Sequence, residues 1–164
     1  MTTASGAHDA VRAAWASIPA PPAEDMQYME WGWGQEAARA FVGVAPVDVN
    51  IGSRGFHAAT PLLDLPPRAA AAYLGTFLMS LLEGIEFQQA MGLFDDIVSR
   101  AHALTCLTLP DFWERVIRPW LPPQCRAVLA QVVSYLVAEQ ELLALTQEQV
   151  NTMLASVKDD GQGS

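Results

Sequence analysis

Positively charged side chains are scarce in this chain of 164 residues. Lysine and arginine together number nine against 18 aspartates and glutamates, which gives a formal charge of -9 at pH 7. A surface of that sign repels a phosphate backbone, so nucleic acid is excluded as a favoured partner. Lys158 is the single lysine, and this bias, together with abundant alanine, is typical of a GC-rich bacterial genome.

Sorting signals and long hydrophobic runs are missing as well. The first fifteen residues include His8, Asp9 and Arg12 and have no apolar segment behind a basic start, so they do not form a secretory signal. The relevant uncharged stretch, Ala69 to Leu82, has fourteen residues, whereas a membrane-spanning helix needs roughly 17 to 25. We therefore expect a cytoplasmic protein with one buried helix and no contact with a membrane.

Cysteine is equally rare. Cys106 and Cys125 are too far apart for a CxxC motif and lie among apolar neighbours, where a thiol packs as a small hydrophobic group. A disulfide is disfavoured in reducing cytosol. No histidine is placed in the sequence to activate either thiol, so both are interpreted as structural.

Hydrophobic residues, in contrast, make up 51% of the chain and charged residues only 16%, against a usual charged share of about 25%. This composition excludes a disordered acidic tail. No repeat and no long linker divides the sequence, so residues 1–164 are predicted to form a single domain with a frayed tail at about 158–164.

Apolar residues recur at helical spacing through most of the chain. The turn-rich stretch 44–60 has room for one short extended piece at 47–51, which is too little for a sheet. The predicted fold class is all-α, a compact bundle of seven or eight helical segments. The expected segments lie at 6–18, 35–42, 65–83, 85–90, 93–104, 108–119, 123–143 and 146–157, of which 85–90 and 93–104 form one interrupted helix or two short helices.

Prolines and glycines mark the expected helix ends. Pro66 and Pro67 suit a first helical turn, and Gly43 suits a left-handed terminator. Gly84 is expected to break the central helix at Glu83, and Pro119 to end the segment before it. Pro122 and Pro123 open what is expected to be the longest segment. Thr146 followed by Gln149 matches a capping box for the last helix.

Catalytic and metal-binding signatures are absent. Neither HExxH nor ExxH occurs, so His102 is interpreted as an exposed or core-edge imidazole, and neither a metal nor a cofactor is predicted. The carboxylate pairs Glu83 with Glu86 and Asp95 with Asp96 are raw material for acid–base chemistry, but on so acidic a chain a solvated face is the stronger interpretation. The chain is not expected to be an enzyme.

Two glycine-containing loops remain. The loop Asn50 to Phe56 has the glycines of an anion cradle but lacks the spacing of known phosphate motifs, so a tight turn that exposes Arg54 is favoured. The run from Trp31 to Gly34 places two tryptophans beside Glu30 and Glu36. It is either a recognition loop or a lid over the core, because tryptophan is enriched at interface hot spots and also fills cores.

Two segments, Leu62 to Gly84 and Leu121 to Leu136, resemble the halves of an uncharacterised bacterial all-helical family. In that family a proline-opened helix with a YLxxFL core pairs with a closing helix opened by proline and glutamine. The matching residues are Pro67, Tyr73, Leu74, Phe77 and Leu78 in the first half and Pro123, Gln124, Arg126, Val128 and Leu136 in the second. The resemblance implies a fold and transfers no active site.

Small acidic helical proteins of this kind resemble bacterial immunity proteins, which neutralise a toxin. That resemblance implies a cytoplasmic binding protein for a basic toxin or effector. The expected contact residues are Glu30, Trp31, Trp33, Glu36, Glu83, Glu86, Asp95 and Asp96. The alternatives are a secretion adaptor or chaperone for an effector, a carboxylate-based enzyme, and, with so much apolar content, self-association as a homodimer.

Overall fold

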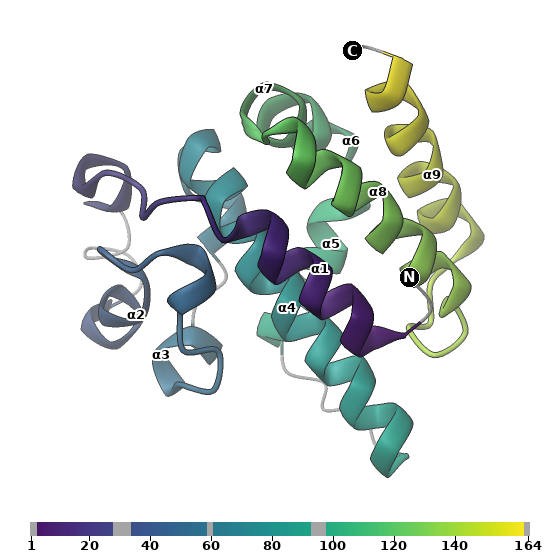
Figure 1. Cartoon of the computed structure of the whole chain (residues 1–164), viewed down its shortest axis with the longest axis horizontal. Helices are drawn as coiled ribbons and strands as arrows, with labels where there is room; N and C mark the ends of the chain where they lie inside the picture. The colour runs from purple at the N-terminus through teal and green to yellow at the C-terminus, as the bar shows by residue number, and fades with distance from the viewer. Residues whose placement is uncertain (1–2, 28–33, 59–60, 93–97, 163–164) are drawn as a thin grey trace.

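The structure, a computed structural model, describes residues 3–27, 34–58, 61–92 and 98–162. Within these ranges the chain is helical and contains no strand, which confirms the predicted all-α class (Figure 1). The α-helices are α1 (Ala4–Trp15), α2 (Gly34–Phe41), α3 (Arg54–His57), α4 (Pro67–Met91), α5 (Val98–Leu107), α6 (Pro110–Phe112), α7 (Arg118–Trp120), α8 (Pro123–Ala138) and α9 (Gln147–Gln162). A π-helical turn at Trp113–Ile117 joins α6 to α7, and 3-10 turns lie at Ala23–Met26, Pro46–Asp48 and Pro61–Leu63.

Helix α4 is the centre of the core. Every residue from Ala69 to Leu82 is buried, as the uncharged stretch predicts. Helices α1 and α5 pack directly against α4, α1 also packs against α8, and α9 packs against α8 (Figure 1). By length and composition α4 is apolar enough to cross a membrane, but 78% of its most apolar window is buried inside the protein. Most of this helix is therefore covered by the rest of the described chain, as in a core helix.

The expected break at Gly84 is wrong, because α4 continues through that residue to Met91. Gly84 is buried, and a Cβ atom there would lie 2.9 Å from Cδ of Arg100 on α5. The glycine therefore leaves room for the arginine side chain to cross the helix surface, and the helix continues through it. The helix ends instead at Gly92, whose φ of 71° gives a left-handed cap.

The segment between α2 and α3 is fixed to α4 by side-chain hydroxyl groups. The Tyr73 hydroxyl lies 2.6 Å from the Phe41 carbonyl oxygen and 2.9 Å from that of Val44. Thr76 Oγ1 donates to the Pro46 carbonyl oxygen at 2.7 Å. Gly43, with φ of 74°, ends α2 as predicted. The stretch 47–51, which has room for a short extended piece, begins instead with a 3-10 turn.

Pro119 does not end its helix, contrary to expectation. The helix continues to Trp120 because the preceding residues form the π-helical turn. In that turn the Arg118 N–H bonds to the Trp113 carbonyl oxygen, five residues back. The wider turn accommodates the proline ring and its missing N–H.

The last two helices differ from expectation in length. Helix α8 has 16 residues and ends at Ala138, so α4 with 25 residues is the longer. The capping box before α9 is confirmed: Gln149 N donates to Thr146 Oγ1 at 3.1 Å, and Thr146 N donates to Gln149 Oε1 at 2.9 Å. The tail expected to fray from residue 158 is helical to Gln162.

We expect Gly75→Ala to destabilise the protein. A Cβ at Gly75 would lie 2.5 Å from the buried Trp15 ring, and overpacking of this kind costs about 1 to 3 kcal/mol. Gly161→Ala is the matched control, since nothing lies within 4 Å of the added carbon in α9. The control should be neutral or gain up to about 1 kcal/mol. Urea unfolding measures the free energy of unfolding of both variants. An equal change in the two would contradict the close contact between Gly75 and Trp15.

Candidate functional site

Three of the eight predicted contact residues lie in the described part of the chain. Glu83 and Glu86 are on α4, and Glu36 is in the first turn of α2. The other five, Glu30, Trp31, Trp33, Asp95 and Asp96, lie outside the described residues and stay predictions.

Glu36 is separate from the two α4 carboxylates. It lines a surface groove between α2 and α3 together with Arg39, Asp48 and Arg54. This groove includes part of the loop from Asn50 to Phe56, which has the glycines of an anion cradle. Ser53 Oγ accepts the Phe56 N–H at 3.2 Å as the cap of α3, and Arg54 is exposed, as the tight-turn interpretation predicts.

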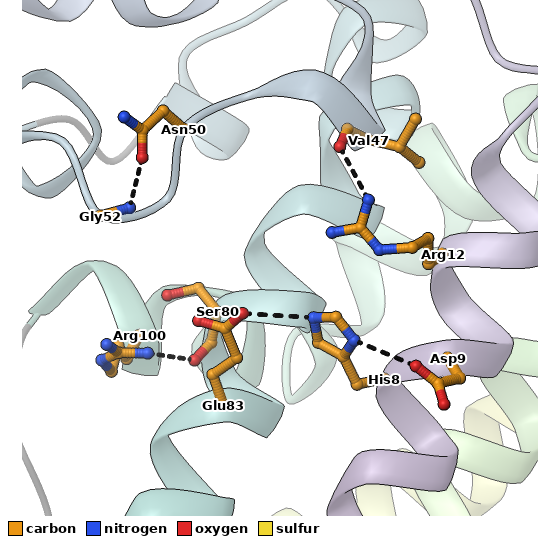
Figure 2. Close-up of polar contacts among 9 residues, drawn as sticks. All are labelled: His8, Asp9, Arg12, Val47, Asn50, Gly52, Ser80, Glu83 and Arg100. Carbon is orange, nitrogen blue, oxygen red and sulfur yellow. Dashed lines mark hydrogen bonds and ion pairs between the residues drawn. The ribbon is translucent and has the colours of Figure 1, made fainter.

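Glu83 belongs to a carboxylate–imidazole cluster between α1 and α4 (Figure 2). His8 Nε2 lies 3.4 Å from Glu83 Oε1, and His8 Nδ1 lies 3.8 Å from Asp9 Oδ1. The His8 side chain is 15% exposed, whereas Asp9 is 79% exposed. Sequence reasoning missed His8 and Asp9 because they join Glu83 only through the packing of two helices distant in sequence.

On the side of Glu83 opposite His8, Arg100 of α5 binds the main chain of α4 (Figure 2). Its Nη1 donates to the Ser80 carbonyl oxygen at 2.7 Å. The guanidinium is therefore held on a backbone carbonyl, and no ion pair joins it to Glu83 or Glu86 in the described part of the chain. Neither α4 carboxylate has a lysine or arginine partner among the described residues.

The arginines that do form ion pairs neutralise carboxylates elsewhere. Arg68 Nε lies 2.6 Å from Asp25 Oδ2, and this contact raises the pKa of the guanidinium through its hydrogen bond and its charge. Arg68 Nη2 also lies 3.7 Å from Glu24 Oε1. The other arginine pairs in the described chain join Arg115 to Asp111 at 2.8 Å, Arg126 to Asp160 at 3.2 Å, and Arg118 to Glu114. The excess negative charge on the described surface therefore lies on the carboxylates that have no arginine partner. These include Asp9 of α1 and Glu83 and Glu86 of α4.

Large apolar side chains lie beside the α4 carboxylates. Phe87 is 48% exposed and Met91 is 63% exposed, one helical turn apart. Figure 1 shows the last turns of α4 extending beyond the neighbouring helices. We call Asp9, Glu83, Glu86, Phe87 and Met91 the acidic end of α4.

His102 and Cys106 form a second polar contact, inside the core. The His102 side chain is buried rather than at the core edge, with its Nε2 accepting the Leu62 N–H at 3.2 Å. Cys106 Sγ is 4.0 Å from the same nitrogen, so one histidine does lie beside a cysteine, a neighbour that the sequence analysis did not identify. The spacing i, i+4 on one helix was the available signal.

Burial keeps both groups of this pair neutral. It lowers the pKa of His102 to about 4 and raises the pKa of the Cys106 thiol to about 12. A thiolate nucleophile needs the opposite shift of the thiol. The pair therefore acts as a hydrogen-bonded part of the core that fixes Pro61–Leu63 against α5.

No group of three histidine, cysteine, aspartate or glutamate side chains is placed to hold a metal ion in the ranges that the structure describes. No family model, no curated protein and no solved structure matches this chain.

We expect His102 to make stability fall in mild acid. Its folded pKa is depressed to about 4, so the unfolded chain takes up the proton first as pH falls below about 6.5. Between pH 7 and pH 5 this coupling costs about 2 kcal/mol of unfolding free energy. His102→Gln keeps an acceptor for the Leu62 N–H and removes the titration, so urea unfolding of the variant should lack that loss. Equal losses in both proteins would contradict a buried neutral imidazole.

Proposed function

We propose that this protein is a cytoplasmic bacterial immunity protein that binds and neutralises a basic toxin or effector. The observation that carries the proposal is the acidic end of α4. There, Glu83 and Glu86 have no lysine or arginine partner among the described residues and adjoin two exposed apolar side chains. A basic protein is the partner whose charge this surface complements.

Charge accelerates the encounter. A carboxylate-rich surface on a chain with a net charge of -9 attracts a basic protein before contact, which raises the association rate and makes it sensitive to salt. Because Glu83 and Glu86 are presented by a helix whose preceding turns are buried on all sides, their positions are fixed before binding. No ordering of a loop is needed.

Apolar contact then slows dissociation. Phe87 and Met91 lie at i and i+4 on α4 and present a row that a partner can cover. Large apolar side chains surrounded by polar groups are the usual arrangement of an interface hot spot. Neutralisation follows when the covered partner surface includes the region that the toxin uses for its own target.

The first prediction from this proposal concerns charge. To identify the toxin, each reading frame next to the gene is expressed alone, and one that stops growth is tested for rescue by this chain. With that toxin purified, Glu83→Lys combined with Glu86→Lys should reduce the association rate by about tenfold at low salt. The difference should shrink at high salt because the interaction is screened. Stopped-flow fluorescence measures the rates.

The matched control is Glu148→Lys combined with Asp159→Lys, which changes the net charge equally at exposed positions of α9. It should leave the association rate within about twofold of the wild type. Equal slowing by both double variants would show that only total charge matters, against a defined contact surface. A complex in which the toxin keeps its activity would favour a secretion adaptor instead.

The second prediction concerns the apolar row. Phe87→Ala and Met91→Ala should each increase the dissociation rate, by about tenfold if the side chain is a hot spot. Leu154→Ala is the control, since Leu154 is 44% exposed on α9. Surface plasmon resonance with immobilised toxin gives the rates. Unchanged dissociation in both α4 variants would place the contact elsewhere.

A further inference from the structure

A groove of 510 Å³ lies on the surface between α2, the 3-10 turn at Pro46–Asp48 and the start of α3. Figure 1 shows α2 and α3 together at one side of the molecule, away from the last turns of α4. The groove is therefore separate from the acidic end of α4. Its charged side chains include two of each sign, Glu36, Arg39, Asp48 and Arg54.

The two arginines of this groove differ from the other arginines of the chain. Each of the others binds a carboxylate or a main-chain carbonyl oxygen. Arg54 has no hydrogen-bond or ion-pair partner within the described residues, and Arg39 makes one long contact, from Nη2 to Gln35 Oε1 at 3.5 Å. A guanidinium group carries five N–H donors in a planar fork that fits a carboxylate. Both arginines therefore have donors available for the carboxylate of a ligand.

Close packing of α3 on α2 brings these two arginines to one groove. A Cβ atom at Gly55 would lie 2.2 Å from the Glu36 carbonyl oxygen and 3.2 Å from the Ala40 Cβ, so only glycine permits this approach. The two arginines directly precede Gly55 and Ala40 in the sequence. Their long side chains consequently start on either side of one contact and can reach the same ligand.

Hydrogen bonds hold the other wall of the groove in place. Thr76 Oγ1 of α4 donates to the Pro46 carbonyl oxygen at 2.7 Å, at the start of the turn that carries Asp48. Asn50 Oδ1 accepts the Gly52 N–H at 3.1 Å (Figure 2). The groove is thus formed before a ligand enters, which lowers the entropic cost of binding.

The carboxylates of Glu36 and Asp48 restrict which ligand the groove accepts. Neither has an ion-pair partner within the described ranges. They repel a simple anion such as phosphate and attract a positive charge. A ligand that carries both a carboxylate and an ammonium group complements both pairs of side chains. Between the charges the groove is lined by Ala40 and Val44, both partly buried, which suit a short aliphatic chain.

We propose that this groove binds a free α-amino acid with an aliphatic side chain. The α-carboxylate accepts hydrogen bonds from Arg39 and Arg54. The α-ammonium group lies against the carboxylates of Glu36 and Asp48, and the aliphatic side chain covers the apolar part of the groove. A peptide segment is disfavoured, because a residue inside a peptide has neither charged backbone group.

Isothermal titration calorimetry of the full chain with L-leucine at neutral pH tests this assignment. Binding at one site is expected. N-acetyl-L-leucine lacks the ammonium group and L-leucinamide lacks the carboxylate, so each should bind at least about tenfold more weakly through the loss of charge-assisted hydrogen bonds. No binding of L-leucine at millimolar concentration, or equal affinity for L-leucine and either analogue, would overturn the proposal.

Variants locate the site. Arg39→Gln and Arg54→Gln should each weaken L-leucine binding by about tenfold or more, because each removes charged donors to the carboxylate. Arg115→Gln is the matched control, since Arg115 is an exposed arginine of the π-helical turn and lies outside the groove. Thermal unfolding checks that each variant is folded. Wild-type affinity in folded Arg39→Gln and folded Arg54→Gln would place the amino acid elsewhere and overturn the assignment.

Discussion

The contact between the Trp15 ring and the backbone of α4 at Gly75 sets the arrangement of the other helices. Trp15 is fully buried, and its Nε1 donates to the Ala71 carbonyl oxygen at 3.4 Å. Because the ring occupies the place of a side chain at Gly75, α1 lies close to α4 in one register. Seven residues back along α1 and eight residues forward along α4, that register brings His8 to Glu83. The carboxylate–imidazole cluster is thus a consequence of core packing.

Helix ends were predictable from sequence where a local device decides them. The capping box at Thr146 needs only two side chains and two N–H groups of the same turn, and Gly43 needs only its own positive φ. Gly84 and Pro119 misled the prediction because their conformations depend on partners. An arginine from α5 occupies the space at Gly84, and a π-helical turn absorbs the missing N–H at Pro119.

The candidate site likewise contains residues that sequence spacing identifies and residues that only the tertiary structure brings together. Glu83 and Glu86 drew attention in the sequence as two carboxylates three residues apart, but a helix break was expected between them, and only the structure shows that the continuous α4 presents both. His8 acquires its role only from a helix that is distant in sequence, so no spacing rule finds it. The His102–Cys106 contact is different, since its i, i+4 spacing was visible and only the burial that holds both groups neutral required the structure.

The excess negative charge at the end of α4 follows from what the arginines bind. Arg115 and Arg118 pair with carboxylates one turn away, and Arg126 joins α8 to α9. Near α1 and α4, in contrast, Arg12 donates to the Val47 carbonyl oxygen and Arg100 to that of Ser80. Main-chain carbonyls thus engage guanidinium groups that would otherwise be available to neutralise Glu83 and Glu86. The packing that buries α4 therefore also leaves its last turns acidic. The net charge is set by the composition, but the position of this negative charge is set by the fold.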